Sequence, residues 1–239
     1  MHIPSTPRRA GRAGFTLIEL LASIAIVGIL AAILIATISR VRASSRGAVC
    51  LSNMRQIATA MQLYANDNQR YLPGPIYQLQ GPYYNIDYRR LPMRLGPYVN
   101  APKATSYGTA QSTMAYAEVF GCPSWKAASA SDTIYSLVVN DRIARDGQPA
   151  LNPWGFGDPN GTGNPADVTV PPLKLNQFDA YGITQSGSTW LIAEADMRFP
   201  VVGGAFWRVS SAPVHDNYRS AIFLDFHVGR LDLQNNPLN

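Results

Sequence analysis

The stretch Phe15-Thr16-Leu17-Ile18-Glu19-Leu20-Leu21 opens an apolar run that extends to Ile38, and this run decides the fold. The run has 24 residues, and Glu19 is its only charged side chain. At about 1.5 Å per residue, a helix of this length spans roughly 36 Å, which is enough to cross the hydrocarbon core of a bilayer. A carboxylate inside such a segment is costly, so we expect Glu19 to have a function and a partner.

The 14 residues before this run have the charge pattern of a cytoplasmic leader. They carry three basic residues and no acid, and they end in two small residues: Arg8, Arg9, Arg12, Ala13 and Gly14. A secretory signal places its cleavage site after the apolar run, whereas here the small residues precede it. Cleavage between Gly14 and Phe15 would remove the leader, leave the apolar helix on the mature chain and place the new amino terminus about one helical turn before Glu19.

The stretch Gly14 to Leu21, Gly-Phe-Thr-Leu-Ile-Glu-Leu-Leu, resembles the amino-terminal signature of type IV pilins and type II secretion pseudopilins. The resemblance implies cleavage after Gly14 by a prepilin peptidase, N-methylation of Phe15 and assembly into a helical filament. It also implies that Glu19 neutralises the amino-terminal amine of a neighbouring subunit, which would supply the partner that a buried carboxylate needs.

The same resemblance implies a set of partners and a location. The partners are the peptidase/methyltransferase, other pilin or pseudopilin subunits, an inner-membrane assembly platform and the lipid bilayer. The chain would span the inner membrane once, with its carboxy-terminal domain in the periplasm, and would enter a filament on assembly.

The helix is expected to continue beyond the apolar run to about Tyr64. Arg40, Arg42 and Arg46 mark the end of the membrane-spanning part, and apolar residues then recur at steps of three and four: Cys50, Met54, Ile57, Met61 and Tyr64. This spacing predicts an amphipathic helix with one face toward a core, and residues 66–68 and Pro73 stop it. We therefore expect a leader at 1–14, a transmembrane or filament-core helix at 15–39, its amphipathic continuation at 40–70 and a globular domain at 71–239.

The globular part is predicted to hold mainly β-structure. Residues 71–133 are expected to be irregular, because six prolines lie between positions 73 and 102, although a short helix at 89–98 is compatible with the sequence. Strands are predicted at 133–140, 188–195, 220–224 and 228–233, the last two as a closing hairpin. Gly, Pro, Asn and Asp predict a long loop at 141–172 that is either functional or mobile. A helix followed by strands predicts an α+β fold with an antiparallel sheet packed on the helix.

A second resemblance concerns the carboxy-terminal half. Three segments resemble those of a pseudopilin-like group: Tyr135-Ser136-Leu137, Trp190 to Glu194, and His215 separated by nine residues from Asp225. In that group the segment continues as Asp-Gly-His-Val, whereas this chain has Phe226 in place of the glycine and then His227. Asp-Gly suits a two-residue hairpin turn that needs a positive φ, which a bulky aromatic residue disfavours. The role of His215, Asp225 and His227 is not evident from the sequence.

The chain has two cysteines, Cys50 on the predicted helix and Cys122 in the irregular segment. A periplasmic domain would place both in an oxidising compartment, which favours a disulfide between them. Such a bond would tie the irregular segment to the helix and stabilise the fold by roughly 2–4 kcal/mol. Two separate buried thiols are the alternative, because cysteine is among the most frequently buried residues.

The charge of the chain gives no indication of nucleic-acid binding. The formal net charge is +5, but without the three leader arginines 17 basic residues stand against 15 acidic ones. This near balance lacks the basic excess of a nucleic-acid-binding domain.

A catalytic or metal site has little support in the sequence. Asp225 and His227 would share a face on a strand, but hairpin ends commonly carry such residues, and no nucleophile motif, phosphate-binding loop or Cys/His metal spacing accompanies them. Asp158, Asn160 and Thr162 alternate in the long loop as calcium ligands would, although the twelfth position lacks the bidentate acid of an EF-hand loop. We therefore expect no enzyme activity and no cofactor, with calcium as the one candidate.

The sequence thus predicts a structural subunit, a pseudopilin of a type II secretion filament. A type IV pilin for adhesion, motility or DNA uptake is one alternative. A membrane-anchored periplasmic enzyme or binding module, which would use the helix only as a tether, is the other.

Overall fold

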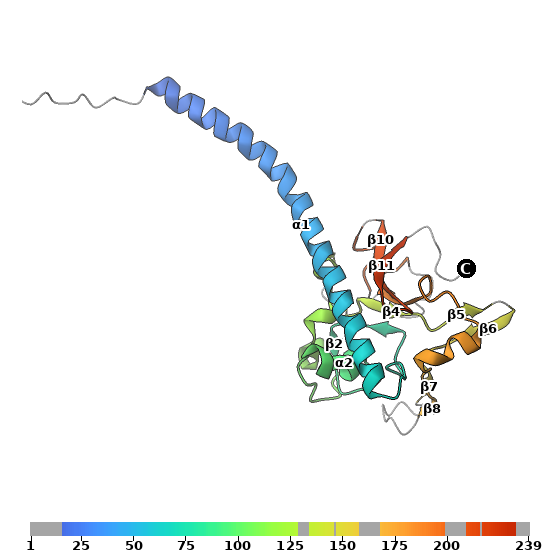
Figure 1. Ribbon diagram of the computed structural model, residues 1–239. Helices are drawn as coiled ribbons and strands as arrows, with labels where there is room; N and C mark the ends of the chain where they lie inside the picture. The colour runs from blue at the N-terminus through green and yellow to red at the C-terminus, as the bar shows by residue number, and fades with distance from the viewer. Residues whose placement is uncertain are drawn as a thin grey trace, which may run out of the picture. The chain divides into compact units, whose positions relative to one another are not determined.

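The computed structural model describes residues 16–128, 134–145, 147–157, 168–198, 209–215 and 217–232. The chain divides into two compact units, Met1–Ser44 and Ser45–Asn239. Helix α1 (Leu17–Asp67) is continuous through both units and has 51 residues (Figure 1). The single long helix predicted from the sequence is therefore confirmed, and it ends three residues later than Tyr64.

The chain leaves α1 through a short polar segment. The Asn68 side-chain amide donates a hydrogen bond to the Tyr64 carbonyl at 2.8 Å, which satisfies one of the free carbonyls at the helix end. Gln69 and Arg70 then take positive φ values of 54° and 71°, a conformation that stops the helix. The predicted stop at 66–68 is confirmed.

The second half of α1 supplies the core of the larger unit. Cys50, Met54, Ile57 and Met61 are each at most 2% exposed, so the predicted apolar face is confirmed. Met54, Ile57 and Met61 belong to the main hydrophobic cluster, together with residues of helix α2 (Leu91–Val99) and of the sheet. Burial of these side chains, rather than helix propensity, holds this part of α1 in place.

One five-stranded antiparallel sheet forms the other layer, in the order β1-β4-β9-β10-β11. The strands are β1 (Leu79–Gln80), β4 (Leu137–Val139), β9 (Trp190–Glu194), β10 (Tyr218–Phe223) and β11 (Val228–Asp232). Leu137 and Val139 point into the main cluster that contains α1, whereas Val138 points into a second cluster on the opposite face. The predicted α+β fold with an antiparallel sheet is confirmed, and so is the closing hairpin β10–β11.

Residues 71–128, the described part of the segment predicted to be irregular, are more regular than the sequence predicted. Strand β1 pairs with β4 at the sheet edge, and β2 (Tyr83–Tyr84) pairs with β3 (Ala115–Tyr116). The short helix compatible with the sequence is α2, and further short elements follow: η1 (Gln111–Thr113), η2 (Glu118–Phe120) and α3 (Pro123–Ala128). The prolines limit the length of these elements but do not prevent them, since Pro92 lies in the first turn of α2, where no backbone hydrogen is needed.

The single long loop predicted at 141–172 is wrong. Two strand pairs occupy its described part: β5 (Ile143–Arg145) with β6 (Gln148–Leu151), and β7 (Phe156–Gly157) with β8 (Val168–Val170). Gly147 allows the tight connection between β5 and β6 because its φ is +64°. Figure 1 shows the β5–β6 pair projecting beyond the main sheet. Two short 3₁₀ helices, η4 (Leu175–Gln177) and η5 (Asp179–Tyr181), lead on to β9.

The tip of the closing hairpin is not the two-residue turn that Asp-Gly would suit. The Phe226 amide donates to the Phe223 carbonyl at 2.8 Å, and the Phe223 amide donates to the His227 carbonyl at 3.0 Å. These bonds enclose a three-residue loop whose last position is left-handed, and Phe226 occupies it with a φ of 64°. Its half-buried ring packs against the main cluster, which helps to offset the backbone cost at a position that suits glycine.

Candidate functional site

The start of α1 is held by a reciprocal pair of hydrogen bonds. The Thr16 amide and hydroxyl both donate to the Glu19 carboxylate, at 2.9 and 2.8 Å, and the Glu19 amide donates to the Thr16 hydroxyl at 3.3 Å. This is a capping box, in which the first and fourth residues satisfy amides that the helix itself leaves free. Glu19 therefore stabilises the end of its own helix while its side chain remains exposed.

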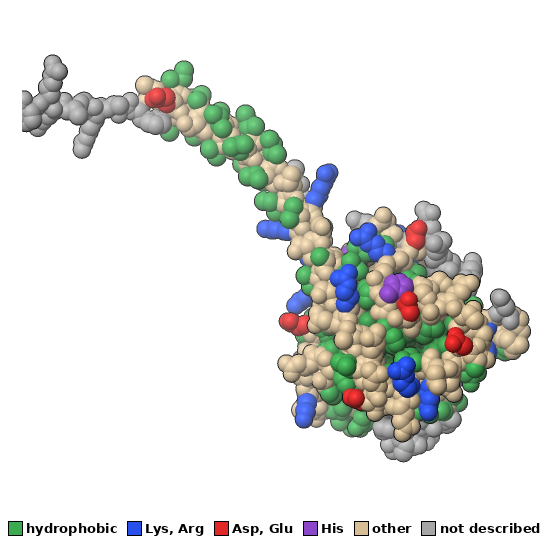
Figure 2. Space-filling model, in the orientation of Figure 1, with side chains coloured by type: hydrophobic (Ala, Val, Ile, Leu, Met, Phe, Trp, Pro, Cys, Tyr) green, Lys and Arg blue, Asp and Glu red, His purple; other side chains and the backbone are tan. Residues whose placement is uncertain are grey.

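The apolar part of α1 has no packing partner among the described residues of its unit. Every large apolar side chain from Leu17 to Ile38 is at least 44% exposed, and Figure 2 shows such side chains along the visible face of this stretch. Among the described residues, α1 is the one helix long and apolar enough to cross a membrane, by length and composition. An apolar surface of this size is typical of a segment that lies in lipid or against other protein. Exposed Arg40, Arg42 and Arg46 follow it.

Several predicted site residues lie outside the described part of the chain. These are Gly14 and Phe15 at the processing junction, and the calcium candidates Asp158, Asn160 and Thr162.

His215 and Glu194 form a buried pair beneath the second half of α1. The His215 Nε2 atom lies 3.1 Å from Glu194 Oε1, and both side chains are 5% exposed. The other carboxylate oxygen of Glu194 accepts a hydrogen bond from the Ser220 amide at 2.8 Å. The His215 ring stacks on Tyr218, with ring centroids 5.0 Å apart. The first residue of the carboxy-terminal motif is thus anchored to β9 and β10 in the core.

The two cysteines adjoin this pair. Cys50 and Cys122 form a disulfide, with their Cα atoms 4.7 Å apart. Cys122 Sγ lies 3.7 Å from His215 Nε2. Near Cys122 the Asn53 side chain also donates to the Gly121 carbonyl at 3.2 Å. The segment before α3 is therefore fixed to α1 by one covalent bond and one hydrogen bond.

A buried ion pair lies further along the same strands. Arg219 on β10 donates two hydrogen bonds to the Asp196 carboxylate, from Nε at 2.7 Å and from a terminal nitrogen at 3.1 Å. The two side chains are 4% and 2% exposed. Asp196 also accepts a hydrogen bond from the Arg198 amide at 2.8 Å. This bidentate geometry compensates the cost of burying both charges.

Asp225 and His227 lie together at the hairpin tip, where both side chains are open to solvent. The Asp225 carboxylate contacts His227 Nδ1 at 2.6 Å and accepts the His227 amide at 3.1 Å, and the side chains are 41% and 46% exposed. Burial acts to raise the pKa of Asp225, but the hydrogen bonds from His227 outweigh it and lower the pKa below its ordinary value. The His227 ring stacks on Phe223 at 4.3 Å. The two residues therefore stabilise the turn, and His215 of the same motif lies elsewhere, in the core.

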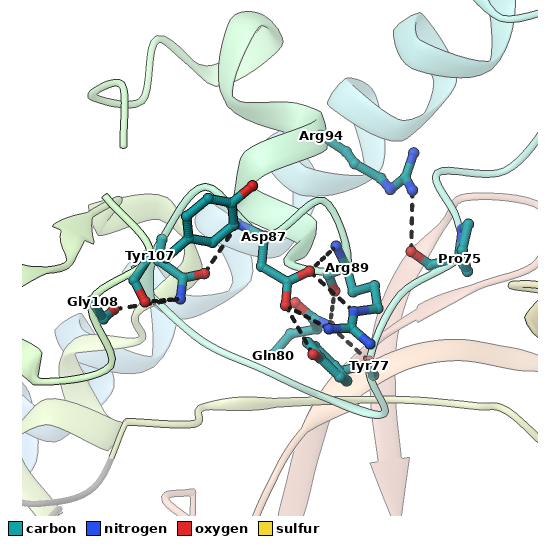
Figure 3. Close-up of polar contacts among 9 residues, drawn as sticks. Pro75, Tyr77, Gln80, Asp87, Arg89, Arg94, Tyr107 and Gly108 are labelled. Carbon is teal, nitrogen blue, oxygen red and sulfur yellow. Dashed lines mark hydrogen bonds and ion pairs between the residues drawn. The ribbon is translucent and has the colours of Figure 1, made fainter. Parts of the chain in front are cut away.

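A third polar cluster fixes the loop between β1 and α2 (Figure 3). Asp87 accepts two hydrogen bonds from the Arg89 side chain, at 3.1 and 3.0 Å, and one from the Tyr77 hydroxyl at 2.8 Å. Burial acts to raise the pKa of Asp87, yet the hydrogen bonds from Arg89 and Tyr77 lower it overall. Burial and the bond to Asp87 raise the pKa of Tyr77 to about 12. The buried Gln80 side chain adds bonds to the Tyr77 and Arg89 carbonyls, at 2.7 and 3.1 Å.

Sequence reasoning missed the acids and the arginine of the core. Glu194 was recognised only as the end of a strand, and Asp196 and Arg219 were not singled out. The available signal was the pair Glu194 and Asp196 at the end of an otherwise apolar strand. Because alternate positions share a face, both acids were expected on the same side of the sheet. Their partners come from β10 and could be identified only from the strand order.

Comparison with known proteins agrees with the amino-terminal features. Residues 9–35 match the family model described as the prokaryotic N-terminal methylation motif. No curated protein and no solved structure matches the chain. The match covers the basic end of the leader, the processing junction, Glu19 and most of the apolar run. The chain therefore carries the signature of type IV pilins and pseudopilins, and this motif implies processing by prepilin peptidase and assembly with other pilin subunits.

Proposed function

We propose that the chain is a pseudopilin, a structural subunit of a periplasmic type II secretion filament. In this role it is cleaved after Gly14, N-methylated at Phe15 and held in the inner membrane by the first half of α1, with the larger unit in the periplasm. The observation that carries the proposal is the exposed apolar half of α1, whose one charged residue lies in its first turn. Such a surface requires lipid before assembly and neighbouring helices after it.

The larger unit supports a structural role. Among the described residues, its fully buried acidic and basic side chains are paired with each other in the core: Arg219 with Asp196, and His215 with Glu194. The exposed histidine of the carboxy-terminal motif, His227, is bound to Asp225 in the turn. These contacts build the fold and leave neither histidine placed as a general base in an open pocket.

The role of Glu19 can be separated from its role as a helix cap. Glu19→Gln keeps an N3 side chain that can complete the capping box but removes the charge, whereas Thr16→Ala removes the capping hydroxyl and keeps the charge. If Glu19 neutralises the amine of a neighbouring subunit, Glu19→Gln abolishes cross-linked multimers in membranes and Thr16→Ala retains them. The opposite pattern would show that Glu19 acts as a cap alone. As a control, mass spectrometry should show that both variants are cleaved after Gly14, as the wild type is.

Deletion of the gene tests the secretion role. We expect the deletion strain to retain specific folded proteins in the periplasm and to lose them from the medium, and the wild-type gene but not the Glu19→Gln variant to restore export. Unchanged secretion together with loss of surface fibres or of DNA uptake would instead identify a type IV pilin. Unchanged function of the Glu19→Gln variant in every assay would identify a tethered module.

A further inference from the structure

We propose that, in the reduced chain, Cys50, Cys122, Glu194 and His215 form a zinc site, which formation of the disulfide removes. The four side chains come from four separate places: α1, the segment before α3, the end of β9 and the segment before β10. Their ligand atoms all lie within 4.8 Å of one another, and all four residues are buried. The sequence alone showed no such site, because its members are 72, 72 and 21 positions apart along the chain.

The distances already approach those of a tetrahedral zinc centre. With zinc bonds of about 2.3 Å to sulfur and about 2.0–2.1 Å to nitrogen and oxygen, tetrahedral ligand atoms lie roughly 3.3–3.8 Å apart. His215 Nε2 is 3.1 Å from Glu194 Oε1 and 3.7 Å from Cys122 Sγ. The two sulfur atoms lie closer than this because they are bonded to each other. Reduction allows them to separate without moving the other two ligands far.

The atoms converge on one point, as metal ligands do. In a proton relay a histidine uses one ring nitrogen toward the nucleophile and the other toward the acid. Here the carboxylate and the sulfur both lie next to Nε2 of His215. Once the thiols lose their protons, a cation among these groups satisfies two thiolates, an imidazole and a carboxylate together, whereas without it the negative groups would repel one another.

Surrounding groups hold the ligands in place. The Ser220 amide binds the second oxygen of Glu194, and the Tyr218 ring stacks on His215. Gly47, one turn before Cys50, faces the same two residues: a Cβ at this position would make ordinary contacts, at 3.4 Å with the Tyr218 hydroxyl and 3.7 Å with the His215 ring. Such outer contacts orient metal ligands and raise affinity. Two thiolates with an imidazole select zinc over calcium or magnesium, which prefer oxygen ligands.

Zinc and the disulfide exclude each other because they use the same two sulfur atoms. The chain is made with both thiols reduced, so zinc can occupy the site before oxidation. Exchange with a disulfide oxidant then forms the Cys50–Cys122 bond, converts the oxidant to two thiolates and releases the zinc ion, so that two electrons leave the chain and two enter the oxidant. Zinc would thereby slow oxidation of the buried thiols until a disulfide oxidant displaces it.

The test uses the full chain without a tag, purified in detergent. The reduced, metal-free protein should take up about one zinc ion per chain, and the same protein with its disulfide intact should take up none. Cobalt in place of zinc should give a thiolate-to-metal charge-transfer band and the intense visible bands of a tetrahedral site. Zinc should also slow alkylation of Cys50 and Cys122 by iodoacetamide and their oxidation by oxidised glutathione, which requires no variant at all.

Variants assign the ligands. His215→Gln should weaken zinc binding at least about tenfold, whereas His227→Gln, which changes an exposed histidine outside the cluster, should leave it unchanged. Several results would overturn the proposal. These are no zinc bound to the reduced wild type, equal amounts bound to the reduced and oxidised proteins, or alkylation rates that are the same with and without zinc. Loss of zinc binding in His227→Gln instead of His215→Gln would also overturn it. The alkylation and cobalt measurements on wild type decide the matter even if His215→Gln does not fold.

Discussion

Reduction of the disulfide should destabilise the larger unit by an amount that follows from the length of the loop it closes. Cys50 and Cys122 are 72 positions apart. In the chain-entropy description, closing a loop of this length removes about 15 cal/mol/K from the unfolded state, or about 4.4 kcal/mol at 25 °C. For a unit of this size each kcal/mol corresponds to roughly 2–4 °C in Tm, so reduction should lower Tm by about 9–18 °C.

Circular dichroism of the full chain in detergent, followed between the oxidised and the fully reduced states, measures this difference. A chelator is added to both samples, so that zinc cannot replace the lost constraint. Cys50→Ala/Cys122→Ala is the matched variant: it should melt near the reduced wild type, and reductant should not change its Tm.

Mass spectrometry under non-reducing conditions accompanies the melting curves. Two free thiols in the untreated protein would show that the bond does not form. A fully reduced wild type that melts within about 2 °C of the oxidised form would refute the entropic reasoning, because the constraint on the unfolded chain would then contribute almost nothing. It would also imply that the contacts of Asn53 and its neighbours fix this segment by themselves.

Three further changes test separate parts of the fold by urea unfolding. Arg219→Met should lower the free energy of unfolding by about 3–5 kcal/mol, because it leaves the Asp196 carboxylate buried and unpaired. Adding Asp196→Asn should recover part of the loss, and equal stability of the single and double variants would contradict this. Asp87→Asn should be less stable than wild type above about pH 4, and the gap should close as the pH falls, because a carboxyl with a lowered pKa contributes stability above its unfolded pKa and loses it on protonation in the fold. Phe226→Gly should be more stable than Phe226→Ala by about 1 kcal/mol, the reverse of the usual order, because φ at this position is positive; a more stable alanine variant would mean that the turn rearranges.

The parts of the fold that the sequence predicted are those with a strong local pattern. The apolar run, the steps of three and four between Cys50 and Tyr64, and the segments of β9 to β11 each repeat one chemical property at the period of one element. These patterns need no knowledge of neighbours, so α1 and the closing hairpin were predicted within a few residues of their bounds.

The parts that were missed depend on tertiary contacts. Strand β1 has two residues in a proline-rich segment, and only its pairing with β4 makes it a strand. The left-handed Phe226 is tolerated because its ring packs on the core, which a turn rule based on local preferences cannot include. Glu194 and His215 are 21 positions apart, and they meet because β9 and β10 are neighbours in the sheet.

The two parts of α1 obey different physical constraints although they form one helix. Between residues 17 and 38 the large apolar side chains are exposed on all sides of the helix, so no single face is selected for packing. The apolar environment that stabilises them must come from lipid or from other subunits. From Cys50 onward one face is buried in the core of the larger unit, and the stability of that face is intrinsic to the chain. A polar substitution in the first part should therefore impair insertion or assembly while the larger unit still folds, and the same substitution on the buried face of the second part should unfold that unit. Glu19, as the one charge in the first part, is consistent with this division: its hydrogen bonds with Thr16 stabilise the end of the helix, and in the proposed filament the amine of a neighbouring subunit compensates its charge.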